Sequence, residues 1–271
     1  MKPSIIFILF LFLLNKAHTQ ELFVYSEPAS NMAAKSLGLR LNNYFNKKPA
    51  SGVYTYQLAP ELMWGISKKL MLHADFFFSN RSGKFLNEGG ALYFKYRFLS
   101  NDKIHNHFRM AAYARAAVNS GKIDQPAIDL MGQNSGYEAG LIATMLEGRT
   151  AISATVGWLH AEDNLDQKKF TYGTSNRNAA GYSLSVGHLV FPLQYKNYDQ
   201  VNMNLMLELP GQTNLGSGRS YFDAAPSVQF ILLSRMRMDI GYRFPLVNDL
   251  PRAADRGFLL RLEYNFFNVY R

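Results

Sequence analysis

The chain has 271 residues, of which 29 are Lys or Arg and 20 are Asp or Glu, so its formal net charge is +9 at pH 7. Charged residues form 18% of the chain, below the ~25% of an average soluble domain, and 14% aromatic residues exclude a disordered chain. The absence of cysteine excludes a disulfide scaffold, cysteine-ligated zinc, an iron–sulfur cluster and a thiol nucleophile.

Residues 1–20 have the pattern of an export signal. Lys2 gives a positive start, 5–14 is an unbroken apolar run, and small residues follow near Ala17. As a helix this run rises only ~15 Å, about half of a ~30 Å hydrocarbon core. The pattern therefore predicts a cleaved signal peptide over 1–20 and a mature domain over 21–271 that contains no spanning helix.

The mature sequence alternates apolar and polar residues with period two. In 235–245, Met236, Met238 and Ile240 share one parity, whereas Arg237 and Asp239 share the other. Successive side chains of a strand point to opposite faces, so this stretch has an apolar face and a charged face. Similar alternation predicts about twelve strands of about ten residues, the length that a tilted strand needs to cross a bilayer. The predicted strands are 36–44, 54–64, 70–78, 92–98, 108–118, 136–146, 151–160, 181–191, 201–209, 221–232, 235–245 and 258–267.

The connections between these strands alternate between short and long. The short ones are 65–69, 100–106, 147–150 and 233–234, with 192–199 intermediate, and the long ones are 46–52, 80–88, 119–135, 161–180, 211–218 and 246–255. Short turns on one side and long loops on the other are typical of a transmembrane barrel. A sheet in hydrocarbon must have no free edge, because unpaired backbone groups are costly there.

The sequence therefore predicts an all-β fold, a single antiparallel up-and-down transmembrane barrel of about twelve strands. A soluble β-sandwich or barrel, with the apolar parity as its core face, is the alternative. Pro60 and Pro226 interrupt two predicted strands, and we expect a bulge or a strand end at each because proline cannot donate to the ladder.

Placing the polar parity inward predicts a set of charged residues in the lumen. The positive members are Arg40, Lys95, Arg97, Arg109, Arg115, Arg235, Arg237, Arg243 and Arg261, and the negative members are Glu61, Asp75, Glu138, Glu208, Asp239 and Glu263. These charges either pair across neighbouring strands and fill a narrow lumen, or the last arginines face water along a solute path that favours anions.

No residue pattern predicts catalysis, a metal site or a cofactor. His73 and Asp75 share an inward face, but no serine is placed to act as their nucleophile. His105 and His107 flank Asn106 in a predicted turn, and a metal site there would need a third ligand, for which Asp102 is the nearest candidate. Lipid-cleaving barrels place His and Ser two residues apart, whereas valines occupy those positions around His188. The basic residues are dispersed along strands, which also disfavours nucleic-acid binding.

Five stretches of the mature chain carry a family resemblance. They are 22–32 (LFVYSEPASNM), 35–40 (KSLGLR), 91–102 (ALYFKYRFLSND), 107–112 (HFRMAA) and 140–144 (GLIAT). Together they resemble an uncharacterised, porin- or transporter-like outer-membrane β-barrel family of Bacteroidota. The resemblance implies the outer membrane of a Gram-negative bacterium and brings no known activity or binding residue.

These observations predict a narrow channel or passive transporter for small solutes, with anions as the expected preference. The first alternative is a closed structural or adhesive barrel that displays 119–135 and 161–180 outward, and the second is a lipid-active enzyme. We expect outer-membrane lipid and the barrel-assembly machinery as partners, with a solute that the sequence does not name. Nucleic acid, cofactors, metals and enzymatic activity are not expected.

Overall fold

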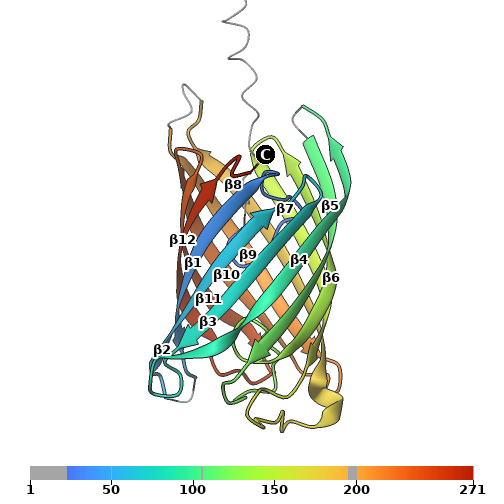
Figure 1. Ribbon diagram of the computed structural model, residues 1–271, viewed down its shortest axis with the longest axis vertical. Coiled ribbons are helices and arrows are strands. Elements are labelled where there is room, and N and C mark those ends of the chain that lie inside the picture. The colour runs from blue at the N-terminus through green and yellow to red at the C-terminus, as the bar shows by residue number, and fades with distance from the viewer. Residues whose placement is uncertain (1–22, 50, 105, 195–199, 271) are drawn as a thin grey trace, which may run out of the picture.

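The computed structural model describes residues 23–49, 51–104, 106–194 and 200–270. Within these residues, twelve antiparallel strands form a closed barrel in which each strand pairs with its neighbours in the chain and β1 pairs with β12 (Figure 1). The strands are β1 (Ser36–Lys47), β2 (Tyr54–Gly65), β3 (Leu70–Ser79), β4 (Leu86–Asp102), β5 (Asn106–Asn119), β6 (Gly136–Glu147), β7 (Thr150–Ala161), β8 (Asn178–Phe191), β9 (Asn202–Asn214), β10 (Ser220–Leu232), β11 (Met236–Asn248) and β12 (Arg256–Phe266). The predicted all-β barrel is confirmed, and the predicted signal peptide lies outside the described residues.

One short 3-10 helix, Thr174–Arg177, precedes β8. In the described ranges, no helix is long and apolar enough to cross a membrane.

The outer surface of the barrel is apolar and the inner surface is polar. In β11, Ile240 is 47% exposed whereas its neighbour Asp239 is fully buried. In β12, Leu262 is exposed and Arg261 is buried in the same way. The period-two alternation of the sequence therefore sets which side chains face outward, and closure leaves no strand edge without a partner.

The two ends of the barrel differ in the length of their connections (Figure 1). The short connections 66–69, 148–149 and 233–235 lie with the start of β1 at one end, here called the turn end, where β4 also ends and β5 begins. The longer connections 48–53, 80–85, 120–135, 162–177, 215–219 and 249–255 lie at the other, the loop end. The predicted alternation of short turns and longer loops is confirmed in part. The predicted intermediate joint between β8 and β9 spans 192–201 and is longer than the connections 48–53, 80–85 and 215–219. His105 and 195–199 lie outside the described residues.

Pro60 and Pro226 lie inside regularly paired strands, so the predicted bulges or strand ends are wrong. Pro60 lies opposite Leu41 of β1, and Pro226 lies opposite Leu207 of β9, without a shift of register. On their other sides, towards β3 and β11, the pairing skips each proline and resumes in the same register. The missing N–H therefore removes a single ladder bond, and the flanking pairs hold the strand in place.

Candidate functional site

The predicted lumen charges lie inside the barrel, except for Arg97 and Arg235. Arg235 is exposed in the turn before β11, so its assignment to the lumen is wrong: a residue outside the strand has no defined face. Arg97 is half-buried at the turn end, beside a shift in the β4–β5 register, and its guanidinium donates to the carbonyl of Lys68 at 2.7 Å.

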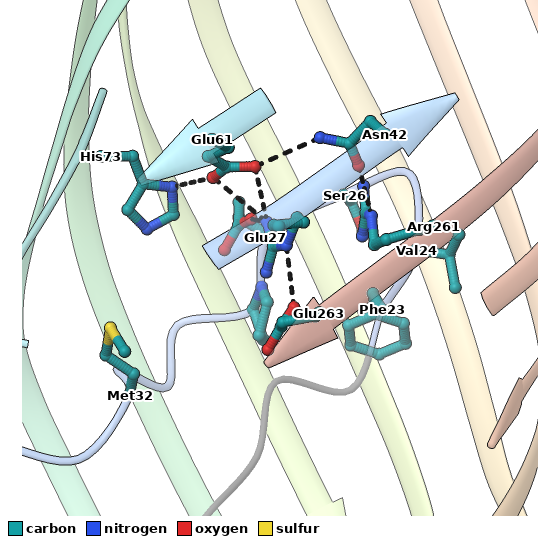
Figure 2. A network of polar contacts seen from close by, with 12 residues as sticks. Phe23, Val24, Ser26, Glu27, Met32, Asn42, Glu61, His73, Arg261 and Glu263 are labelled. Carbon is teal, nitrogen blue, oxygen red and sulfur yellow. Dashed lines mark hydrogen bonds and ion pairs between the residues drawn. The ribbon is translucent and has the colours of Figure 1, made fainter. Parts of the chain in front are cut away.

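Arg40 of β1 is the centre of a buried group of carboxylates. Its guanidinium contacts Glu263 at 2.8 Å, Glu27 at 3.0 Å and Glu61 at 3.1 Å (Figure 2). Glu61 also contacts Nδ1 of His73. The strand-borne members come from β12, β1, β2 and β3, which are consecutive in the sheet, so these charges pair between neighbouring strands. Glu27 adds a carboxylate from the segment before β1.

A second ion-pair group lies on the β3–β6 wall. Arg115 contacts Asp75 at 3.0 Å and Glu138 at 3.6 Å, and its guanidinium lies 5.0 Å from the centre of the Tyr93 ring. Asp75 therefore has a basic partner other than His73, and the predicted proximity of His73 and Asp75 does not form a catalytic pair.

A third group lies near the loop end on β10 and β11. The fully buried carboxylate of Asp223 contacts Arg243 at 2.8 Å and Arg252 at 2.5 Å, and both guanidinium groups lie over the Tyr221 ring. The side chain of Arg243 keeps 32% of its surface exposed. Two cations contact one carboxylate here, and Asp129 of the loop 120–135 is a second carboxylate that lines the same cavity.

Strand alternation did not identify Glu27, Asp223 or Arg252. Glu27 and Arg252 lie outside strands, and Asp223 lies at the register shift of β10. The predicted set had nine cations and six carboxylates. Removing Arg97 and Arg235 and adding Arg252 leaves eight cations, and adding Glu27 and Asp223 gives eight carboxylates. The structure therefore removes the excess of arginine on which the expected anion preference was based.

Residues 23–35 cross the lumen at the turn end before β1 begins. Met32 packs with Met63 and Met71 on one side, and Phe23 packs in an apolar cluster on the other. Figure 2 shows the segment running between these two walls, inside the ring of strands. Between them Ala29 is fully buried. Strand periodicity does not predict this placement, because the segment has no period-two alternation.

The loop 120–135 folds into the barrel from the opposite end. Its residues Ile123, Ile128 and Leu130 are buried in a cluster with the strands. The amide of Gln212 in β9 donates to the carbonyl of Ile128 at 2.8 Å and accepts its N–H at 2.9 Å. Gln57 of β2 donates to the Met131 carbonyl at 2.5 Å. The outward display of 119–135, expected for the adhesive alternative, is therefore wrong.

The loop 162–177 remains outside the lumen, and Leu165 in it is exposed. Asp163 accepts the N–H of Phe170 at 2.9 Å and also contacts Arg177. These two interactions lower the pKa of the Asp163 carboxyl below its usual value.

A cavity of about 370 Å³ lies between the N-terminal segment and the inward loop. The segment lines it with Val24–Glu27, the loop lines it with Gln125–Met131, and the strands contribute mainly Arg, Glu, Asn, Gln and Tyr side chains. Among the strand-borne arginines that line this cavity, Arg256 and Arg243 have exposed side-chain fractions of 44% and 32%. Arg40, Arg115 and Arg261 are nearly buried. The cavity can hold a small polar solute, and both of its ends are narrowed by the chain itself.

Glu27, Glu61 and His73 bring three potential metal ligands within 4.8 Å of one another. Arg40 contacts both carboxylates, and the ammonium group of Lys95 contacts Glu27 at 3.3 Å. Two fixed cations beside the carboxylates oppose a divalent ion by charge repulsion, so we assign these residues to the ion-pair group.

The other histidines of the described residues lie outside this interior. His107 contacts Asp102 at 2.9 Å at the turn end, and His105 lies outside the described residues. His160 contacts Asn178 at 2.8 Å. His188 is exposed on the outer face, as its parity predicts, and contacts Thr150.

No model of a known protein family and no curated protein sequence matches the chain. Solved structures that are similar include the COG4313 outer membrane channel from Pseudomonas putida F1, at 12% identity over 90% of this chain and 100% of that chain, with a TM-score of 0.55. The NanC porin is similar at 10% identity over 85% of this chain and 98% of that chain, with a TM-score of 0.47. OccK11 (OpdR) from Pseudomonas aeruginosa has 10% identity over 85% of this chain and 66% of that chain, with a TM-score of 0.40. The first similarity shows that this chain has the fold of an outer-membrane β-barrel channel.

Proposed function

We propose that the protein is a narrow channel or passive transporter for small solutes in the outer membrane of a Gram-negative bacterium. The observation that carries this proposal is the polar cavity of about 370 Å³ inside a closed barrel with an apolar outer surface. An apolar outer face suits acyl chains, and a polar interior suits water and dissolved solutes. A barrel that only displayed loops would not require a polar cavity between two inward-folded segments.

The expected preference for anions depends in this proposal on Arg243. The eight cations and eight carboxylates counted above balance, so an excess of positive charge among them does not support selectivity. Arg243 shares Asp223 with Arg252, however, and its guanidinium is partly exposed beside the cavity. A solute that passes this point meets the exposed part of this guanidinium, which lowers the barrier for anions relative to cations.

The location and orientation follow from the same physical features. A signal peptide over 1–20 would export the chain, the barrel-assembly machinery would insert it, and lipid would cover the outer face. The turn end would then face the periplasm, because short turns lie on that side in outer-membrane barrels. We also propose that the protein is a member of the Bacteroidota barrel family and that the predicted lumen charges inside the barrel, such as Arg40 and Arg243, lie along the solute path.

Current through planar bilayers tests the channel. We expect discrete steps in the full chain, or in a variant without residues 23–32, together with a reversal potential that favours anions under a tenfold KCl gradient. Arg243→Gln should move that potential towards zero, whereas Arg235→Gln, which removes the same charge outside the lumen, should leave it unchanged. The absence of current steps in both chains would contradict the channel, and equal effects of the two substitutions would contradict the role of Arg243.

A further inference from the structure

The carboxylate of Glu208 binds the backbone of the N-terminal segment. Glu208 is fully buried in β9, and its Oε1 accepts the N–H groups of Val24 at 2.7 Å and Tyr25 at 2.8 Å. Its Oε2 accepts both the N–H and the hydroxyl of Ser26 at 2.7 Å. For the described part of the chain, every hydrogen bond to this carboxylate comes from these three residues. A buried carboxylate without such donors is strongly unfavourable, so the wall is suited to consecutive peptide N–H groups.

Other groups of the lumen wall also bind the main chain of the segment. Lys95 of β4 donates to the carbonyl of Pro28 at 2.8 Å, and the hydroxyl of Thr144 in β6 accepts the N–H of Ala29 at 2.9 Å. The guanidinium of Arg237 in β11 donates to the carbonyl of Phe23. Contacts to backbone N–H and C=O groups recognise an extended peptide without depending on most of its side chains.

Two side-chain contacts add selectivity to this backbone recognition. Glu27 lies between Arg40 at 3.0 Å and Lys95 at 3.3 Å. Phe23 and Val24 pack in an apolar cluster with residues of β7, β9 and β12. The wall therefore favours a peptide with apolar residues followed, three or four positions later, by a carboxylate.

We propose that the lumen wall around Glu208 is a binding site for an extended acidic peptide, and that residues 23–32 occupy it as a tethered ligand. The segment contacts strands on opposite sides of the barrel, from Met71 of β3 to Glu208 of β9. It thereby blocks the turn end of the cavity, and the channel opens when it leaves. The blocking part rests on the proposed channel function, whereas the peptide site does not.

Binding of a free peptide tests the site directly. A chain without residues 23–32 is refolded in detergent and titrated with a fluorescent peptide of the sequence FVYSEPASNM. We expect saturable binding to this chain, and at least about tenfold weaker binding of the peptide in which Glu27 is replaced by Ala, because two charged contacts are lost. The intact chain should bind little peptide, since its own segment fills the site. Equal binding of a scrambled peptide, or no binding to the folded truncated chain, would overturn the proposal.

A disulfide lock tests the same placement without truncation. The hydroxyl oxygens of Ser26 and Ser185 of β8 are 2.9 Å apart, and the chain has no native cysteine. The double variant Ser26→Cys/Ser185→Cys should therefore form a disulfide on mild oxidation, which fixes the segment to the wall. The two single variants are the controls. Failure of the folded double variant to cross-link would contradict the placement of the segment.

Current recordings of the locked chain separate the two proposals. If the segment blocks the channel, oxidation should abolish current steps and reduction should restore them, while the single variants should not respond. Current that is unchanged by a complete cross-link would overturn the blocking role. Peptide binding and cross-linking in a chain that never conducts would support the peptide site and refute the channel function.

Discussion

An arginine placed on the outer face of β11 should destabilise the barrel by an amount that depends on its depth in the bilayer. Ile240 is 47% exposed on this face and lies between Val228 of β10 and Leu260 of β12. It is four residues from Met236, where β11 begins at the turn end. With a rise of ~3.4 Å per residue and a tilt of about 40°, this position is ~10 Å along the barrel axis, close to the middle of a ~25 Å apolar band.

Ile240→Arg should therefore cost ~2–4 kcal/mol of unfolding free energy, because the guanidinium has only apolar cross-strand neighbours and acyl chains around it. Val247→Arg is the matched control, since Val247 lies on the same strand with 49% of its surface exposed. It is eleven residues from Met236, ~28 Å along the axis, and its substitution should cost only ~0–1 kcal/mol near the interface.

Equilibrium unfolding in phosphatidylcholine liposomes measures both costs. Guanidinium titrations followed by the fluorescence of Trp64 and Trp158, both exposed on the outer face, give the free energy by linear extrapolation. If the two variants differ by less than about 0.5 kcal/mol, or if Val247→Arg is the more harmful, the outer face of β11 does not contact the bilayer core as the structure implies.

Three further outcomes are expected from other parts of the molecule. Arg40→Gln should lower the unfolding free energy by ~3–5 kcal/mol in the same titration, because it leaves buried carboxylates without their shared guanidinium. A loss below about 1 kcal/mol would show that these carboxylates are hydrated. Gly89→Ala should lower the unfolding free energy by ~1–3 kcal/mol more than Gly83→Ala. Both glycines have a positive φ, but only at Gly89 would the new Cβ meet a backbone oxygen. Equal unfolding midpoints of the two variants would refute this. In intact cells, a membrane-impermeant maleimide should label the variant Ser82→Cys at the loop end. The variant Ser234→Cys at the turn end should be labelled only after the outer membrane is permeabilised. The reverse pattern would contradict the proposed orientation.

The register of β11 illustrates what can be predicted from local sequence. Met236, Met238 and Ile240 alternate with Arg237 and Asp239, and the backbone of a strand turns this alternation into two faces whatever the partner strand is. Number, facing and connection lengths of the strands follow from such local rules. The same rules fail at Arg235, because a residue in a turn has no face that its parity can assign.

Pairing inside the lumen depends on which distant segments the closed barrel brings together, and the sequence does not contain that information. Arg40 meets Glu263 because β1 and β12 close the sheet, and it meets Glu27 because the preceding segment turns back into the lumen. The sequence supplied the candidate arginines and suggested an excess of positive charge, and the fold then matched them with carboxylates from elsewhere in the chain.

The sequence by itself determined the class of fold, because alternation with period two is a property of neighbouring residues and a closed sheet is the arrangement that leaves no edge in a bilayer. Only the tertiary structure decided how the lumen is filled. Residues 23–35 and the loop 120–135 have no strand periodicity, and their positions are set by distant partners such as Glu208 and Gln212. Those contacts join residues far apart in the chain, so the closed barrel must bring them together before they can form.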